Sequence, residues 1–244
     1  MRNRSVRLIL CVVAVIVAAS FLGGCATTTQ EVQKRRYFFP RLPERPRLEW
    51  LNAYSDQNDF PKKGMGSFLA NVVGEESGVA LESPLDIKAS PDGRVFVADT
   101  ALPGVAIFDL KNKEVRLLGG AKGQQLFVRP TNLALDDGGN LYVLDVDRKM
   151  ITVFDQAEKP LREITYADTM KGGGALAWDR LRKRLVCVDV RGDAVYFLTP
   201  EGKLIGKFGR SGDLDGDLNR PSSVALNSKG EIIIGDAFNA RIQV

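Results

Sequence analysis

The stretch Pro84–Asp109 reads PLDIKASPDGRVFVADTALPGVAIFD, and variants of it recur three more times further along the chain. The four copies open with Pro84–Ile87, Pro130–Leu133, Gly173–Leu176 and Pro221–Val224. A second landmark, an apolar run that ends in aspartate, keeps the same register and closes at Asp99, Asp145, Asp189 and Asp236. Two landmarks that recur together with a period of between about 40 and 50 residues predict an all-β repeat fold, the β-propeller.

Each copy contains the signals of short antiparallel strands joined by tight turns. In the second copy, the apolar runs Leu133–Leu135 and Leu141–Leu144 flank Asp-Asp-Gly-Gly, whose residues tolerate the positive φ angles of a hairpin turn. Met150–Phe154 and Pro160–Ile164 follow as a third and a fourth strand. The second strand is apolar almost throughout, which predicts burial on both faces between neighbouring four-stranded blades.

The sequence motifs of these copies resemble those of the NHL-repeat family of β-propellers. The shared elements are P-x-x-[ILV], a D-G or G-G turn, V-x-D and a closing V-x-x-F-D, and they extend over residues 83–244. The third copy departs most, with Gly173 in place of the proline and Leu198-Thr199 in place of Phe-Asp. The resemblance implies a six-bladed ring, of which four copies are visible here.

The fourth copy stops within its third strand, at Val244. Two explanations stay open, because an unfinished sheet would leave unpaired strand edges. We favour a fragment whose further residues hold about two more blades, as the repeat logic suggests. The alternative is a closing strand from residues 46–54, an alternating segment that carries Trp50 and Tyr54.

The N-terminus indicates export. Three arginines precede an uncharged run from Leu8 to Leu22, which suits a signal peptide and is short for a membrane span. Leu22-Gly-Gly-Cys25 resembles the bacterial lipobox, in which the cysteine is lipidated and becomes the first mature residue; an ordinary signal peptide with an incidental cysteine is the alternative. The predicted organisation is a signal peptide over 1–24, a lipidated N-terminus and flexible tether over 25–45, a lead-in over 46–82 and propeller repeats over 83–244.

The same residues predict the compartment and the kind of partner. Ala26 follows the lipidated cysteine, and the lack of an aspartate there favours the outer membrane, with the protein facing the periplasm. The formal net charge of +4 falls to +1 once Arg2, Arg4 and Arg7 leave with the signal peptide. This near balance lacks the basic field that nucleic-acid binding needs. We expect attachment to the membrane through Cys25 and a protein or peptide partner in the envelope.

Catalytic chemistry has little support in the residues. The chain contains no histidine, whereas zinc lyases and Ser-His-Asp or Cys-His nucleophile systems depend on imidazole. Cys187 occupies a slot filled by Val97, Val143 and Ile234 in the other copies, so it is expected in the core. Asp213–Asn219 is rich in acidic residues but lacks the glycine and glutamate positions of an EF-hand loop, which favours a loop between blades. No catalytic residue, metal or cofactor is therefore predicted.

The candidate binding residues surround one mouth of the central channel. If the first strand of each blade is innermost, the positions two residues after each opening ring that mouth: Asp86, Asn132, Ala175 and Ser223. Three cations precede the openings and would rim the same mouth: Arg129, Lys171 and Arg220. The predicted function is a lipid-anchored binding or scaffolding propeller. A propeller lyase or hydrolase, or a sensor of a small envelope ligand, is the alternative.

The repeated aspartates are expected to serve the fold. Asp99, Asp145, Asp189 and Asp236 each end a strand and open a turn. Aspartate at such a position caps free backbone N–H groups. A ring of carboxylates open to a ligand is the alternative interpretation.

Overall fold

A computed structural model describes residues 37–40, 43–45, 47–60, 79–102, 104–119 and 125–244 of the chain. The chain divides into two compact units, Met1–Asn52 and Ala53–Val244. The predicted signal peptide, Cys25 and residues 26–36 of the predicted tether lie outside the described residues.

The described part of the first unit is a small β-hairpin. Strands β1 (Tyr37–Phe39) and β2 (Leu48–Trp50) pair antiparallel, with Phe38 opposite Glu49. Tyr37 and Trp50 pack edge to face, with ring centroids 5.8 Å apart. The segment predicted to close the last blade therefore takes β1 as its hydrogen-bonded neighbour, and its closing role stays a prediction.

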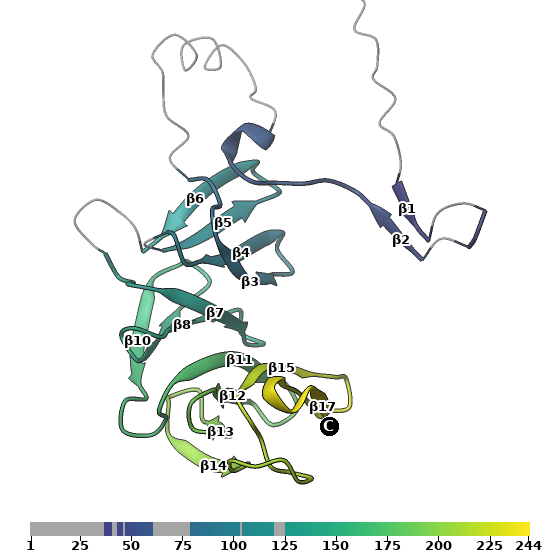
Figure 1. The fold of residues 1–244 in the computed structure, drawn as a ribbon. Helices are drawn as coiled ribbons and strands as arrows, with labels where there is room; N and C mark the ends of the chain where they lie inside the picture. The colour runs from purple at the N-terminus through teal and green to yellow at the C-terminus, as the bar shows by residue number, and fades with distance from the viewer. Residues whose placement is uncertain (1–36, 41–42, 46, 61–78, 103, 120–124) are drawn as a thin grey trace, which may run out of the picture. The chain divides into compact units, whose positions relative to one another are not determined.

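The second unit is all-β, and its four sheets are the blades of a β-propeller (Figure 1). Three blades have four antiparallel strands, and the fourth has three among the described residues. Blade 1 comprises β3 (Pro84–Ala89), β4 (Arg94–Asp99), β5 (Val105–Asp109) and β6 (Glu114–Leu118). Blade 2 comprises β7 (Pro130–Leu135), β8 (Leu141–Asp145), β9 (Met150–Phe154) and β10 (Pro160–Thr165).

The later blades repeat this order. Blade 3 comprises β11 (Gly173–Asp179), β12 (Arg184–Asp189), β13 (Ala194–Leu198) and β14 (Leu204–Phe208). Blade 4 comprises β15 (Pro221–Leu226), β16 (Ile232–Asp236) and β17 (Arg241–Gln243). Two short 3-10 turns, η1 (Gln57–Asp59) and η2 (Ala237–Asn239), accompany the strands, and the described residues contain no α-helix. The predicted fold class is confirmed.

The first strand of each blade lies innermost. Strand β3 contacts β7, β7 contacts β11 and β11 contacts β15, so the four first strands follow one another around a common axis. Strand order within each sheet then runs outward along the chain, from β7 through β8 and β9 to β10 in blade 2. This is the arrangement on which the predicted mouth residues depend.

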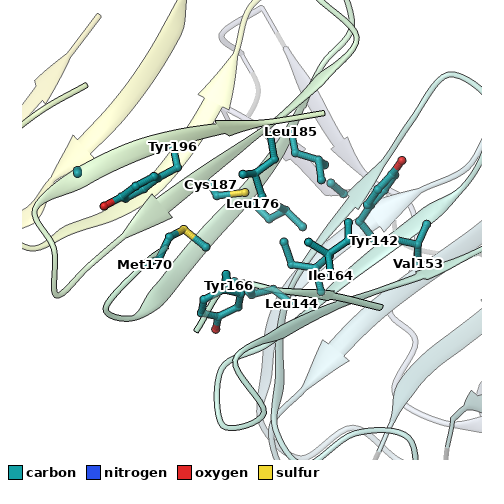
Figure 2. Close-up of a cluster of buried hydrophobic side chains, with 14 residues drawn as sticks. Tyr142, Leu144, Val153, Ile164, Tyr166, Met170, Leu176, Leu185, Cys187 and Tyr196 are labelled. Carbon is teal, nitrogen blue, oxygen red and sulfur yellow. The ribbon is translucent and has the colours of Figure 1, made fainter. Parts of the chain in front are cut away.

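Apolar residues from consecutive blades form the core. Figure 2 shows the largest cluster, in which Tyr142 and Leu144 of blade 2 pack with Leu176, Leu185 and Cys187 of blade 3. All five residues of β8 are buried, as expected for a strand covered on both faces. Burial raises the pKa of the Cys187 thiol to about 12, so this cysteine behaves as a small core residue, as predicted.

Blade 1 has an apolar groove of about 460 Å³ on its face away from blade 2. Ile87 and Val97 pair within it as Leu133 and Val143 pair in blade 2. In blade 2 these positions pack against blade 1. The groove of blade 1 therefore corresponds to the face through which blade 2 packs against its neighbour.

Candidate functional site

One end of the propeller axis is defined by the pairing of the first two strands of each blade. The residue that opens the first strand lies opposite the aspartate that closes the second: Pro84 with Asp99, Pro130 with Asp145, Gly173 with Asp189 and Pro221 with Asp236. The openings of the first strands and the turns after the second strands therefore share one end of the axis. We call this end the mouth rim, and the end with the turns between first and second strands the opposite rim.

The aspartates of the mouth rim bind backbone and do not face the channel. Asp145 is fully buried and accepts the N–H of Val128 at 2.7 Å and the N–H of Arg129 at 3.3 Å. On its other side it accepts the N–H groups of Asp147 and Arg148 at 3.1 Å. The Asp189 carboxylate accepts the backbone N–H groups of Lys171 and Gly172 in the same way, and the Asp99 carboxylate accepts those of Glu82 and Ser83. The expected turn-capping role is confirmed, because each carboxylate ties the segment entering its blade to the turn after its second strand.

Asp236 keeps this role with more side-chain partners. Burial acts to raise its pKa, but hydrogen bonds from the Asn219 N–H and from the side chains of Asn239, Arg241 and Gln243 outweigh it. The pKa of Asp236 is consequently held below its ordinary value. The side chain is therefore an ionised structural anchor and is poorly placed to act as an acid.

A pocket of about 550 Å³ lies on the axis at the mouth rim, and we call it the mouth pocket. Every blade contributes to it the residue at which the register of its first strand is interrupted: Leu85, Thr131, Gly174 and Ser222. Such a β-bulge re-aims side chains and is common next to functional sites. In blade 3 the bulged residue has little room for a side chain, since a Cβ on Gly174 would lie 2.0 Å from Cγ2 of Val190.

Cationic side chains surround the mouth pocket. Arg129, Lys149, Lys171 and Arg191 all line it and are all exposed. Arg129 forms an ion pair with Asp147, at 2.7 Å between Nη2 and Oδ1. Within the part of the chain that the structure describes, the side chains of the other three cations have no carboxylate partner. The rim therefore carries an excess of positive charge directed at solvent.

The structure brings three of the six predicted binding residues together. Arg129, Asn132 and Lys171 line the mouth pocket. Asp86 lies elsewhere, where it accepts the Leu133 N–H at 2.8 Å and the Lys88 ammonium at 2.6 Å. This carboxylate links the first strands of blades 1 and 2, and it lines the apolar groove of blade 1.

The remaining two predicted residues lie in blade 4. The Arg220 guanidinium lies 5.5 Å from the ring centroid of Phe238, an exposed aromatic side chain. Ser223 is exposed and faces Gly235, where a Cβ would lie 2.3 Å from its hydroxyl oxygen. Neither residue lines the mouth pocket. Ala175, the seventh position predicted at the mouth, is buried. The predicted ring therefore reduces to a cationic site centred on blades 2 and 3.

Sequence reasoning missed Lys149 and Arg191 as well as the bulged residues. Lys149 ends the turn between β8 and β9, and Arg191 lies in the turn between β12 and β13. The antiparallel pairing of first and second strands places both turns at the mouth rim. The signal available in the sequence was a basic residue soon after the V-x-D aspartate in two copies, Lys149 after Asp145 and Arg191 after Asp189.

The acidic segment Asp213–Asn219 is a loop between β14 and β15, as predicted. Its backbone carbonyl oxygens point at a side chain, since the Arg241 guanidinium donates to Asp213 at 2.9 Å, Leu214 at 2.7 Å and Asp217 at 2.9 Å. Gln243 also donates to the Asp217 carbonyl at 2.7 Å. The guanidinium therefore occupies the place where carbonyl ligands would gather around a cation.

The described ranges hold no group of three or more histidine, cysteine or acidic residues arranged to bind a metal. Among these same residues, no helix has the length and apolar character that a membrane crossing requires.

Comparison with known proteins gives the class of the molecule. No protein-family model matches the chain, and no curated protein does. A streptogramin B lyase structure is similar with a TM-score of 0.55 and 15% identity, over 68% of this chain and 52% of the lyase. A putative gluconolactonase is similar with a TM-score of 0.52 and 19% identity, over 68% of this chain and 59% of that one. Virginiamycin B lyase from Staphylococcus aureus is similar with a TM-score of 0.50 and 13% identity, over 66% of this chain and 54% of the lyase.

These likenesses establish the fold. The chain is a β-propeller repeat protein, and it spans between half and three fifths of the length of the solved structures named above. At such low identity the similarity carries no activity, substrate or partner to this chain. Membership of the NHL-repeat family stays a prediction from the repeat wording.

Proposed function

We propose that this chain is a lipid-anchored propeller of the bacterial envelope that binds a protein or peptide partner at the mouth pocket. The observation that carries the proposal is the convergence of all four blades on one polar, cation-rimmed pocket of about 550 Å³. A rigid repeat scaffold that presents turn and bulge residues around an axis is well suited to recognition.

The predicted features of the N-terminus would locate this binding module at the membrane. Lipidation of Cys25 would hold the chain at the membrane, and residues 25–45 would act as the tether. Ala26 after the cysteine favours the outer membrane with the propeller in the periplasm. The partner expected in this compartment is an envelope protein or peptide, since an exported lipoprotein does not normally meet nucleic acid.

Site-specific crosslinking in cells tests the proposal. A photoreactive residue replaces Asn132 at the mouth pocket, and a matched variant carries it at the exposed Ser228 of the opposite rim. The expected result is a covalent adduct with an envelope protein or peptide from position 132 and none from position 228. Equal adducts from both positions, or adducts from position 228 alone, would overturn the choice of surface.

An enzymatic function of the lyase or lactonase kind is the second candidate, favoured by the names of two structures with similar folds. Such chemistry needs a group that can accept or donate a proton at the pocket. The carboxylate that lines the mouth pocket is Asp147, and Arg129 already holds it in an ion pair. Turnover of a streptogramin B or a gluconolactone that Lys171→Gln abolishes would establish this alternative in place of a binding role.

A sensor of a small envelope ligand is the third candidate, and it differs from the first in the size of the partner. Crosslinking at position 132 to a sugar or a short peptide, without a protein adduct, would favour it.

A further inference from the structure

Three of the four cations of the mouth pocket differ from most of the arginines in the blades, because they lack a carboxylate partner among the described residues. Elsewhere in the described residues, guanidinium groups are matched to carboxylates: Arg94 and Arg116 with Glu158, Arg184 with Asp179, and Arg241 with Asp236. Lys149, Lys171 and Arg191 form no such pair in the described part of the chain. Three like charges gathered at one pocket repel one another, and an anionic ligand would relieve that repulsion.

The anions close to the mouth pocket are already committed. Asp145 and Asp189 lie behind it, fully buried, and each accepts four backbone N–H groups from the two segments that it joins. Asp147 pairs with Arg129. None of these three carboxylates is available to the free cations, so the pocket faces solvent as a basic surface.

The uncharged lining favours a polypeptide over other anions. Thr131, Asn132 and Ser222 supply hydroxyl and amide groups, and Gly172–Gly174 present backbone without side chains. Leu85 and Val146 add a small apolar contact. Among the residues that the structure describes, no aromatic side chain lines the pocket, whereas proteins that bind single-stranded nucleic acid stack bases on aromatic rings. This combination suits a short peptide with several carboxylates.

We infer that the mouth pocket recognises an acidic segment of its partner, whose Asp or Glu side chains pair with Lys149, Lys171 and Arg191. The inference rests on the proposed function, which it narrows from any protein or peptide to one with clustered carboxylates. Charge pairs at an exposed rim govern specificity and the rate of encounter more than total affinity. Binding is therefore expected to be fast and sensitive to salt.

The test uses the full chain in detergent and a fluorescent hexaglutamate peptide, followed by fluorescence anisotropy. The expected result is saturable binding that weakens on the order of tenfold or more in the double variant Lys171→Glu/Arg191→Glu. Raising the salt from about 0.01 M to about 1 M, which shortens the screening length from about 30 Å to about 3 Å, should abolish it. Hexaserine and hexalysine peptides should not bind.

The matched control reverses two lysines of the opposite rim. Lys203 and Lys229 are exposed, so Lys203→Glu/Lys229→Glu makes a comparable change in net charge away from the pocket. Hexaglutamate affinity should stay within about twofold of the parent in this variant. An equal loss in both double variants would show a general charge effect and overturn the inference, as would unchanged affinity in the mouth variant. Thermal melting of each variant separates loss of binding from loss of fold.

Two further outcomes separate this inference from the proposed function. If hexaglutamate does not bind but the photoreactive residue at position 132 still captures an envelope protein, the acidic-segment inference fails and the proposed function stands. If a single-stranded oligonucleotide binds more tightly than hexaglutamate at equal charge, both the inference and the proposed class of partner are wrong.

Discussion

The carboxylate of Asp145 accepts the backbone N–H of Val128 at 2.7 Å and joins two segments that are distant in sequence. The first precedes the opening strand of blade 2 and the second follows its second strand. Asp99, Asp189 and Asp236 repeat this contact in the other blades. The mouth rim is therefore held by buried carboxylates, which leaves its exposed residues free to vary in chemistry.

Replacement of Asp145 should be among the most damaging single changes. Asp145→Ala leaves buried N–H groups without an acceptor, and we expect a loss of about 2 to 4 kcal/mol in the free energy of unfolding. Asp147→Ala, which removes only the exposed ion pair with Arg129, is the control and should cost about 0 to 1 kcal/mol. Urea unfolding of the three proteins measures both. Equal losses would contradict the anchoring role.

Stability should fall in acid through specific carboxylates. The pKa of Asp236 is lowered, although burial acts the other way, by the Asn219 N–H and three side chains; the pKa of Asp179 is lowered in a similar way by Arg182 and Arg184. A group with a depressed folded-state pKa contributes stability above its unfolded pKa, about 3.9 for aspartate. That contribution is lost as the pH falls through the lower, folded pKa. The free energy of unfolding should therefore be steady from neutral pH to about 5 and decrease below about 4.

The variant Asp236→Asn isolates one of these groups. Its free energy of unfolding should be lower than that of the parent at neutral pH, and its decrease in acid should be shallower. An unchanged pH profile would contradict the assignment of acid sensitivity to this carboxylate.

Lys113 offers a stabilising substitution. Its φ of 62° lies in the left-handed region, where a side chain costs about 1 kcal/mol relative to glycine. Lys113→Gly should raise the free energy of unfolding by up to about 1 kcal/mol. Lys111→Gly in the same turn, at a residue without positive φ, is the control and should not raise it. A decrease at position 113 equal to that at position 111 would count against the assigned backbone geometry.

Cys187 should be inert in the folded protein. In a Cys11→Ser/Cys25→Ser background, a thiol reagent at about pH 8 should react with Cys187 only after unfolding, since burial raises its pKa to about 12. Cys187→Val, which places in blade 3 the residue found at position 143 of blade 2, should keep most of the stability. Rapid labelling of the native chain would show that the interface between blades 2 and 3 opens.

Acylation of Cys25 is testable by itself. Metabolic labelling with a radioactive fatty acid should mark the chain in a bacterial host, and Cys25→Ser should remove the label. Label retained in the Cys25→Ser variant would contradict the lipobox interpretation of Leu22–Cys25.

The blades were predictable because two different kinds of physical pattern agree in every copy. Apolar runs such as Val95–Ala98 mark strands buried on both faces, and the turn residues between runs fix where the chain reverses. The slot shared by Cys187 and Val143 likewise revealed core packing, since a position filled by small apolar residues in every blade has one common environment. Local signals of this kind survive in a single sequence.

The mouth pocket was only half predictable. The motif P-x-x-[ILV] does not show which residue between proline and the aliphatic position bulges, and a bulge changes which side chain faces the axis. Prediction therefore chose Asp86 and Ser223, whereas the residues at the pocket are Leu85 and Ser222. Lys149 was missed because its place depends on strand register, which only the folded sheets make explicit.

Hydrogen exchange of the chain with and without a bound acidic peptide tests the central claim most directly. The account predicts slower exchange at residues 128–132, 146–149, 171–174 and 190–193, with no change at the opposite-rim turns 136–140, 180–183 and 227–231. Slowing confined to the opposite rim or to the outer strands would show that the peptide binds elsewhere and would contradict the mouth pocket as the binding site.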